Sequence, residues 1–118
     1  MANKSIIFHM CKKNKWQVAL ASGIYLGSSQ DINDGFIHFS TVDQILESAE
    51  KHRMGQRGLV LLSVEVGLLG EALRWEESRE GDFFPHLYGS LPLKAVIRVD
   101  DLELGKDGRH KFPEGLNL

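Results

Sequence analysis

Cysteine and proline are scarce in this sequence of 118 residues, which has one of the former and three of the latter. Cys11 has no second cysteine with which to form an internal disulfide, so the chain fits a reducing compartment, with Cys11 as a small buried apolar residue. No apolar run is long enough to cross a bilayer, and residues 1–8 lack the apolar segment of a signal peptide. We therefore expect a cytoplasmic protein that does not enter a membrane.

An excess of either charge is also lacking, because 14 Lys and Arg residues and 16 Asp and Glu residues give a formal net charge of -2. Proteins that bind nucleic acid in general carry clustered Lys and Arg. The local basic run here, Lys12, Lys13 and Lys15, begins a predicted helix, where a solvated helix face explains it. General nucleic-acid binding is therefore not expected.

The sequence does have the composition of an ordinary globular domain, with 42% hydrophobic and 25% charged residues. Its length fits one domain, which we expect to span residues 1–118. The hydrophobic pattern predicts an α+β domain with a small mixed or antiparallel split β-sheet and two main helices.

The predicted strands are Ser5–Met10, the segment 36–39, Leu59–Val66, Leu73–Trp75 and Lys94–Val99. Leu59–Val66 is apolar enough to be a central strand buried on both faces, whereas Lys94–Val99 alternates and would turn Ala95, Ile97 and Val99 to one side. The predicted helices are Lys13–Ser22, where Trp16, Ala19 and Leu20 recur at helical spacing before a C-cap at Gly23, and a second helix that follows Thr41 and fades at Arg53–Gly58. Gln30–Gly35 is predicted to be a polar turn and Glu76–Pro92 a loop.

The segment Gly35–Gln44 is the one around which the rest is organised, and it reads Gly-Phe-Ile-His-Phe-Ser-Thr-Val-Asp-Gln. Its first half favours a strand, and Ser40 or Thr41, with a carboxylate or amide three residues later, forms a capping box that starts a helix. His38 would then lie at the end of a strand beside a helix N-terminus. Pockets usually form at such places in α and β domains.

Three histidines lie in apolar surroundings: His9 near the end of the first strand, His38, and His86 in the aromatic-rich loop. A buried imidazole needs a hydrogen-bond partner, and three of them in one small domain suggest that they converge on a shared polar cleft. A satisfied core histidine is the alternative for each ring taken alone.

Glu76 is the carboxylate that we associate with this cleft. Because it follows Trp75, its pKa could be raised, and it could serve as a base or orient a ligand hydroxyl. The structural alternative is that Arg74 pairs with an acid at a sheet edge.

Other kinds of site compete with this interpretation. His9, His38 and His86 with a carboxylate would supply enough ligands for zinc, although no His-x-x-x-His or Cys-x-x-Cys spacing supports a metal. Ser40 as a nucleophile lacks a Gly-x-Ser-x-Gly context and is better explained as a helix cap or a ligand hydrogen-bond donor. A non-catalytic module that binds a small metabolite or a partner through the same cleft stays open.

Four segments of the chain match a known family. Phe8-His9, Gly35-Phe-Ile-His-Phe-Ser-Thr with Gln44, Leu73-Arg-Trp-Glu76 and Phe84-Pro-His-Leu-Tyr-Gly-Ser-Leu-Pro92 closely resemble the domain of unknown function 952 family over nearly the whole chain. That family has no established reaction. Its fold looks like that of ADP-ribosyltransferases, and Phe-Ile-His-Phe-Ser is similar to the His-Val-His-Leu-Ser phrase of NAD-dependent RNA 2′-phosphotransferases.

The resemblance implies an ADP-ribosyltransferase-like fold that binds NAD or a related nucleotide in a split-sheet cleft. His9 would stand where these transferases place a strand residue that holds a ribose of NAD, and Ser40, Tyr88 and Arg74 are further candidates for cofactor binding. The phosphotransferases use arginines to grip a phosphate, for which Arg74 or Arg79 would substitute.

The same resemblance implies an ADP-ribosyl-type transfer, with His38, Glu76 and His86 as the candidate catalytic residues. Glu76 and His86 are the candidates for the late glutamate on which arginine-specific and polymerase-type transferases rely. The expected partner is a small-molecule or nucleotide ligand, and no residue is assigned as a metal ligand. One fold hosts many reactions, so the fold is implied more directly than the chemistry.

Overall fold

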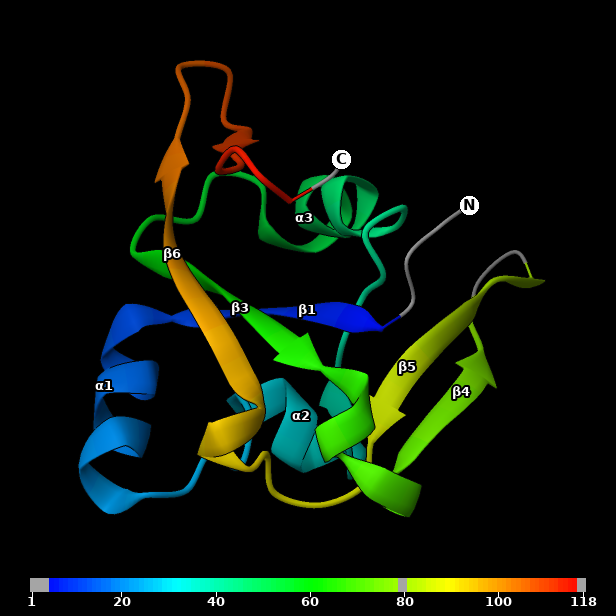
Figure 1. Ribbon diagram of the computed structural model, residues 1–118. Coiled ribbons are helices and arrows are strands. Elements are labelled where there is room, and N and C mark those ends of the chain that lie inside the picture. The colour runs from blue at the N-terminus through cyan, green and yellow to red at the C-terminus, as the bar shows by residue number, and fades with distance from the viewer. Residues whose placement is uncertain (1–4, 79–80, 117–118) are drawn as a thin grey trace.

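The chain forms two antiparallel sheets that meet at one point (Figure 1). The computed structural model describes residues 5–78 and 81–116. In the first sheet the order is β1 (Ile6–Lys12), β3 (Leu59–Glu65), β6 (Val96–Leu104), β7 (His110–Lys111), and in the second it is β2 (Ile37–His38), β5 (Phe83–Leu87), β4 (Leu73–Glu77). Phe8 and Ser40 exchange two backbone hydrogen bonds of 2.8 Å and so link β1 to the chain just after β2. The predicted α+β class and split antiparallel sheet are confirmed.

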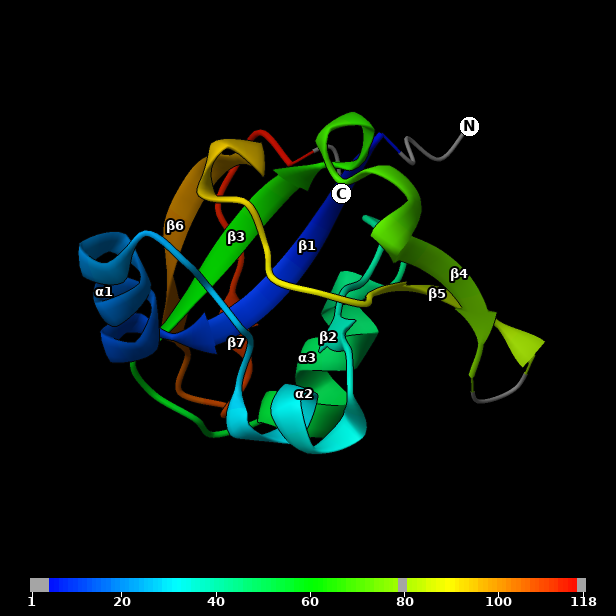
Figure 2. The ribbon, with the colours of Figure 1, turned by 90° about the horizontal axis from the view of Figure 1, so that it is seen from below.

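Helices cover both faces of the first sheet. Figures 1 and 2 show α1 (Lys13–Ser22) and α3 (Ile45–Arg53) on opposite sides of β1 and β3, and α2 (Ser29–Asp34) on the same side as α1. Trp16 and Ala19 of α1 pack into one core cluster, and Ile45 and Ala49 of α3 pack into the other. Three short 3-10 helices, Val66–Leu68, Gly70–Ala72 and Leu93–Ala95, complete the elements of the described residues.

β3 is the central strand of this layered core, as predicted. It pairs with β1 on one side and β6 on the other. Its side chains alternate between the two clusters: Val60 and Leu62 face the α1 side, whereas Leu59 and Leu61 face the α3 side. Because both faces are covered, nearly every position of β3 must be apolar.

The prediction for α1 is confirmed at both ends. Gly23 adopts a left-handed conformation with φ of 86° and donates its N–H to the carbonyl of Ala19 at 2.8 Å, which ends the helix. Leu20, however, is 57% exposed, so the buried stripe of α1 is narrower than its apolar spacing indicates.

The polar turn predicted at Gln30–Gly35 is wrong, because this segment belongs to α2. Ser28 accepts a hydrogen bond from the N–H of Asp31 at 3.2 Å, and the Asp31 carboxylate accepts one from the N–H of Ser28 at 2.8 Å. This capping box starts the helix, and Gly35 ends it at a φ of 87°. Turn-forming residues here serve as the two ends of a short helix.

The loop predicted at Glu76–Pro92 is also wrong, because β4 continues to Glu77 and Phe83–Leu87 forms β5, the middle strand of the second sheet. Pro85 lies opposite Trp75, and its carbonyl accepts a hydrogen bond from the N–H of Phe39 at 3.0 Å. A proline usually argues against a central strand. Here its carbonyl still takes part in the pairing.

The expected start of α3 needs correction too. The helix begins at Ile45, and the side chain of Gln44 reaches back to accept a hydrogen bond from the N–H of Thr41 at 3.0 Å. Ser40 does not cap the helix but donates a hydrogen bond of 3.0 Å to the hydroxyl of Ser48. His38 therefore lies seven residues before α3 and not directly beside its N-terminus.

The last long strand begins later than predicted, at Val96, and runs to Leu104. Ala95 is buried, but Ile97 and Val99 are 54% and 42% exposed. The register shift between Ser63 and Val64 distorts the pairing with β6 at this end. Among the described residues, no helix is both long and apolar enough to span a membrane.

Candidate functional site

A pocket of about 350 Å³ opens where the two sheets meet. Its lining comes from β1 (Phe8, His9, Met10), α2 (Gln30, Asp31), β2 and the residues after it (His38, Phe39, Ser40), α3 (Ser48, His52, Arg53) and the β4–β5 hairpin (Ser78, Phe84, His86). The expected convergence of three histidines is thus observed. Ser40 lines the same pocket, whereas Arg74, Glu76 and Tyr88 do not.

Strand alternation explains how the second sheet supplies this lining. Ile37 of β2 and Leu87 of β5 are paired and turn into the core, where each is 1% exposed. The next pair, His38 and His86, therefore turns to the opposite face, with ring centroids 5.6 Å apart. Phe36 stacks on His86 at 4.1 Å and so fixes the plane of that ring.

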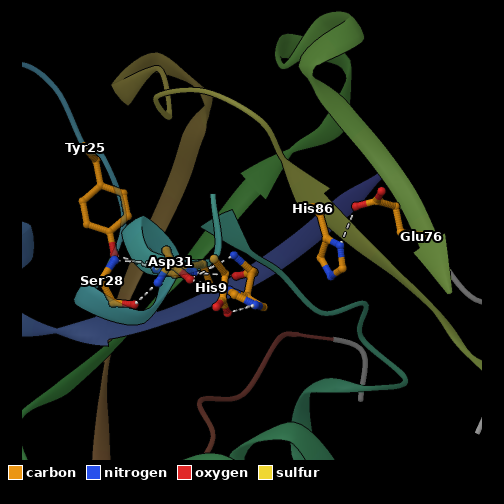
Figure 3. A network of polar contacts seen from close by, with 8 residues as sticks. His9, Tyr25, Ser28, Asp31, Glu76 and His86 are labelled. Atoms are coloured by element: carbon orange, nitrogen blue, oxygen red, sulfur yellow. Dashed lines mark hydrogen bonds and ion pairs between the residues drawn. The ribbon is translucent and has the colours of Figure 1, made fainter. Parts of the chain in front are cut away.

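Asp31 is the centre of a polar network on the α2 side of the pocket (Figure 3). One carboxylate oxygen lies 2.6 Å from Nδ1 of His38 and 3.2 Å from the backbone nitrogen of His38. The other accepts the capping hydrogen bond from Ser28 and lies 3.7 Å from Nε2 of His9. The second ring nitrogen of His38, Nε2, faces the carboxylate of Asp34 at 3.2 Å.

These contacts keep Asp31 ionised although its side chain is only 3% exposed. Burial by itself raises the pKa of a carboxyl group, but the hydrogen bond from His38 and the backbone donors of Ser28 and His38 outweigh that effect. The pKa of Asp31 falls to about 2. Asp31 is therefore a fixed negative charge that ties α2 to β2.

His9 lies behind this network, in the middle of β1 and not at its end. A carbonyl can only accept, so Nδ1 donates to the carbonyl of His38 at 2.6 Å, and Nε2 accepts from the hydroxyl of Tyr25 at 2.6 Å. Burial lowers the pKa of His9, which favours this neutral form. Both ring nitrogens are thus engaged within the protein, and a ribose hydroxyl could reach Nε2 only by replacing Tyr25.

Glu76 and His86 form a second pair, from β4 and β5 (Figure 3). The carboxylate of Glu76 accepts a hydrogen bond from Nδ1 of His86 at 2.8 Å and another from the hydroxyl of Tyr88 at 2.6 Å. The bonds from Tyr88 and His86 lower the pKa of Glu76, contrary to the raised pKa that its tryptophan neighbour suggested. Because Nδ1 donates to Glu76, Nε2 is the nitrogen of His86 that remains for a ligand in the pocket that the ring lines.

The remaining predicted residues lie beside the pocket. Arg74 pairs with His86 across β4 and β5, so both project from the same face of the sheet. Its guanidinium lies 4.9 Å from the centroid of the Tyr88 ring, a cation–π contact. Tyr88 acts on the pocket through Glu76, whose carboxylate it helps to hold, and that bond raises the pKa of Tyr88. Arg79 lies outside the described residues.

The metal alternative finds no support in residues 5–78 and 81–116, where no group of three or more His, Cys, Asp or Glu side chains is arranged to hold an ion. The rings of His9 and His38 are already bound through both nitrogens. Cys11 is buried, and this burial raises the pKa of its thiol to about 11, so it is not a nucleophile at neutral pH.

Sequence reasoning missed the residues that α2 and α3 contribute. Asp31 could have been found as the acid of a capping box with Ser28. Ser48 and His52 are four residues apart, so they project from one side of α3 next to its apolar stripe. This spacing of two polar residues indicates a polar surface beside the core. Arg53 is the next residue, and nothing in the sequence indicates that it lines the pocket.

Comparisons with known proteins place the chain in a family. The family model of DUF952, proteins of unknown function, matches residues 10–99. A crystal structure of protein CC0527 from Caulobacter crescentus is 44% identical, covers 96% of this chain and 99% of its own, and superimposes with a TM-score of 0.90. The solution NMR structure of CC0527 is 46% identical, covers 89% of this chain and 90% of its own, and gives a TM-score of 0.79.

Both structures come from structural genomics, and no curated protein matches the chain. None of these likenesses involves an ADP-ribosyltransferase or an RNA 2′-phosphotransferase, so that part of the resemblance stays a prediction. The family model spans most of the chain, and CC0527 matches nearly all of it. The chain therefore belongs to the DUF952 family of proteins of unknown function.

Proposed function

We propose that the pocket binds NAD or a related nucleotide and that the protein is an ADP-ribosyl-type transferase. The observation that carries this proposal is the Glu76–His86 pair, in which Nδ1 is bound to the carboxylate and Nε2 remains for a ligand in a pocket of nucleotide-compatible size. The match of Phe-Ile-His-Phe-Ser to the phosphotransferase phrase supports the same ligand class. A cytoplasmic setting belongs to the proposal and fits the single, unpaired Cys11.

The donor set of the pocket suits a nucleotide. Gln30, Ser40 and Ser48 offer amide and hydroxyl groups for ribose, and Arg53 offers a guanidinium for phosphate. His38 is held by two carboxylates and therefore gives the wall beside the ribose a fixed shape. In this proposal His9 does not touch the ligand directly but holds Tyr25 and the backbone of His38 in place.

NAD would supply a ribose whose bond to nicotinamide is ready to break. His86 would accept the proton of the incoming nucleophile at Nε2 while that nucleophile bonds to C1′ of the ribose, and the bonding pair of the C1′–N bond would leave with nicotinamide. Glu76 would stabilise the imidazolium that forms, since it already accepts the Nδ1 proton. Its negative charge and that of Asp31 would favour the positive character that develops on the ribose.

Calorimetry with NAD and ADP-ribose, combined with an assay of nicotinamide release, tests the proposal. We expect wild type to bind both ligands and release nicotinamide, and Glu76→Gln to keep binding but lose most of the turnover, because the amide cannot stabilise the imidazolium. Glu77→Gln is the matched control: Glu77 is the next residue of β4, and its side chain projects from the other face of that strand. No heat and no gain in thermal stability at millimolar ligand would end the proposal.

A non-catalytic binding module is the second candidate. It is favoured by the engagement of both ring nitrogens of His9 and of His38 within the protein. Among these three histidines, His86 is then the one with a ring nitrogen left for a ligand. A module predicts ligand binding in wild type and in Glu76→Gln without nicotinamide release from either. If wild type releases nicotinamide and Glu76→Gln does not, the module is excluded.

A further inference from the structure

Arg53 has an unusual position among the cations of this protein. It lines the pocket from the last residue of α3, and its side chain is half-buried. Several other cations pair with a carboxylate, as Lys51 does with Glu47 at 2.9 Å and Arg109 with Glu50 at 2.9 Å. Within the described part of the chain, Arg53 has no such ion pair and no side-chain hydrogen bond.

Asp31, the carboxylate that lines the pocket, forms no ion pair with Arg53. One oxygen of Asp31 is used by the ring and backbone of His38, and the other accepts from the N–H of Ser28. The charge of Arg53 nevertheless reaches the buried network: burial is the main cause of the lowered pKa of His9, and Arg53 lowers it further. The guanidinium therefore lies at the pocket, and no carboxylate among residues 5–78 and 81–116 forms an ion pair with it.

A cation at the C-terminal end of a helix is favourable by itself, because it interacts with the helix dipole. Lys51, His52 and Arg53 all lie in this last turn. That effect explains a basic residue at this end of α3 but not its place in the lining of a pocket. A second observation points to a ligand there.

Ser48 supplies that observation. It lines the same pocket five residues earlier on α3, and it is 9% exposed. Its oxygen accepts the proton of Ser40 at 3.0 Å, so its own proton remains to be donated. No described residue accepts that proton through a hydrogen bond of the Ser48 side chain. A buried hydroxyl donor without an acceptor is costly unless a bound group completes it.

We propose that Arg53 and Ser48, with Gln30 of α2, which lines the same pocket, form a subsite for a phosphate group of the ligand. A phosphate offers several acceptor oxygens at one place, which suits the planar fork of a guanidinium and adjacent neutral donors. The ligand then lies with its phosphate at α3 and its reactive end at His86 of β5. The inference deepens the proposed function and rests on it for the identity of the rest of the ligand.

The phosphate subsite can be tested with small probes and a matched pair of variants. The probe is inorganic pyrophosphate, titrated into the protein while backbone amide signals of α2 and α3 are followed by NMR. Arg53→Gln removes the guanidinium, and Arg57→Gln removes a neighbouring exposed arginine that does not line the pocket. Arg53→Lys keeps the charge but not the bidentate geometry, and thermal melts of all variants check that they fold.

We expect pyrophosphate to shift the signals of residues 30, 48 and 53 in wild type and in Arg57→Gln. Arg53→Gln should weaken binding of pyrophosphate and of ADP-ribose roughly 10- to 100-fold, the loss typical of charge-assisted hydrogen bonds, with Arg53→Lys in between. Adenosine, which has no phosphate, should bind wild type and Arg53→Gln equally. Shifts elsewhere on the molecule, or equal affinity in a folded Arg53→Gln, would overturn the subsite.

The two proposals fail in different ways. If pyrophosphate binding depends on Arg53 but neither NAD nor ADP-ribose binds, the phosphate subsite is supported and the nucleotide function is contradicted. NAD binding and nicotinamide release that do not change in Arg53→Gln would keep the function and remove the subsite.

Discussion

Replacement of Asp31 by asparagine probes the contact network that shapes the pocket. The change keeps the size of the side chain but removes the charge that accepts from His38 and Ser28. The pKa of Asp31 is lowered from 3.8 to about 2. This difference means that ionised Asp31 stabilises the fold by about 2.5 kcal/mol at neutral pH. In Asp31→Asn, the amide NH2 group would also face a donor of His38 or Ser28, and two donors cannot form a hydrogen bond with each other. We therefore expect a loss of at least about 2.5 kcal/mol and a drop in melting temperature of roughly 10 °C.

Urea unfolding at neutral pH measures this loss, and Asp34→Asn is the matched control. Asp34 contacts the same histidine from the same helix at 3.2 Å, but its carboxylate is 35% exposed, so its loss should cost less than about 1 kcal/mol. A carboxyl group whose pKa is lower in the folded than in the unfolded state stabilises the fold at pH values above its unfolded-state pKa. This stabilisation is lost as the pH falls. The gap between wild type and Asp31→Asn should therefore narrow from pH 4 toward pH 2. Equal losses in the two variants, or a gap independent of pH in this range, would refute the reasoning.

Three further predictions concern stability and are checked by the same urea unfolding. Tyr25→Phe should cost about 1–3 kcal/mol, because Nε2 of His9 then lies buried without its donor, and a neutral result would contradict the assigned hydrogen bond. Gly35→Ala should cost about 1 kcal/mol, because its φ of 87° suits glycine; a stabilised variant would argue against this helix end. Leu62→Ala should cost about 2–5 kcal/mol and Ile97→Ala less than about 1 kcal/mol, since Leu62 is 0% and Ile97 54% exposed; similar losses would contradict the core described for the first sheet.

The parts of the fold that the sequence predicts well are those where local pattern and tertiary environment agree. Leu59–Glu65 is apolar at almost every position because both of its faces are covered, and α1 carries its own stop signal at Gly23. The convergence of His9, His38 and His86 was also predictable. Burial of a polar ring requires partners, and in a domain this small three such rings and their partners lie close together.

The parts of the fold that the sequence does not predict depend on contacts between segments far apart in the chain. Pro85 argues locally against a strand, yet β2 and β4 on either side of it hold β5 extended. The polar residues of α2 resemble a turn until the side chain of Asp31 is seen to close both a capping box and a link to β2. The proposed role of Arg53 cannot be predicted from the sequence, because it depends on the absence of an ion pair that only the structure reveals.

The central claim is that the pocket between the two sheets holds a nucleotide whose reactive end meets His86. A crystal structure of the protein soaked with ADP-ribose tests this claim most directly. We predict the ligand in the pocket between β1, α2 and α3, with its free ribose at hydrogen-bond distance from Nε2 of His86 and its diphosphate at Arg53. A ligand bound on another surface, or bound in the pocket with its ribose away from His86, would contradict the account.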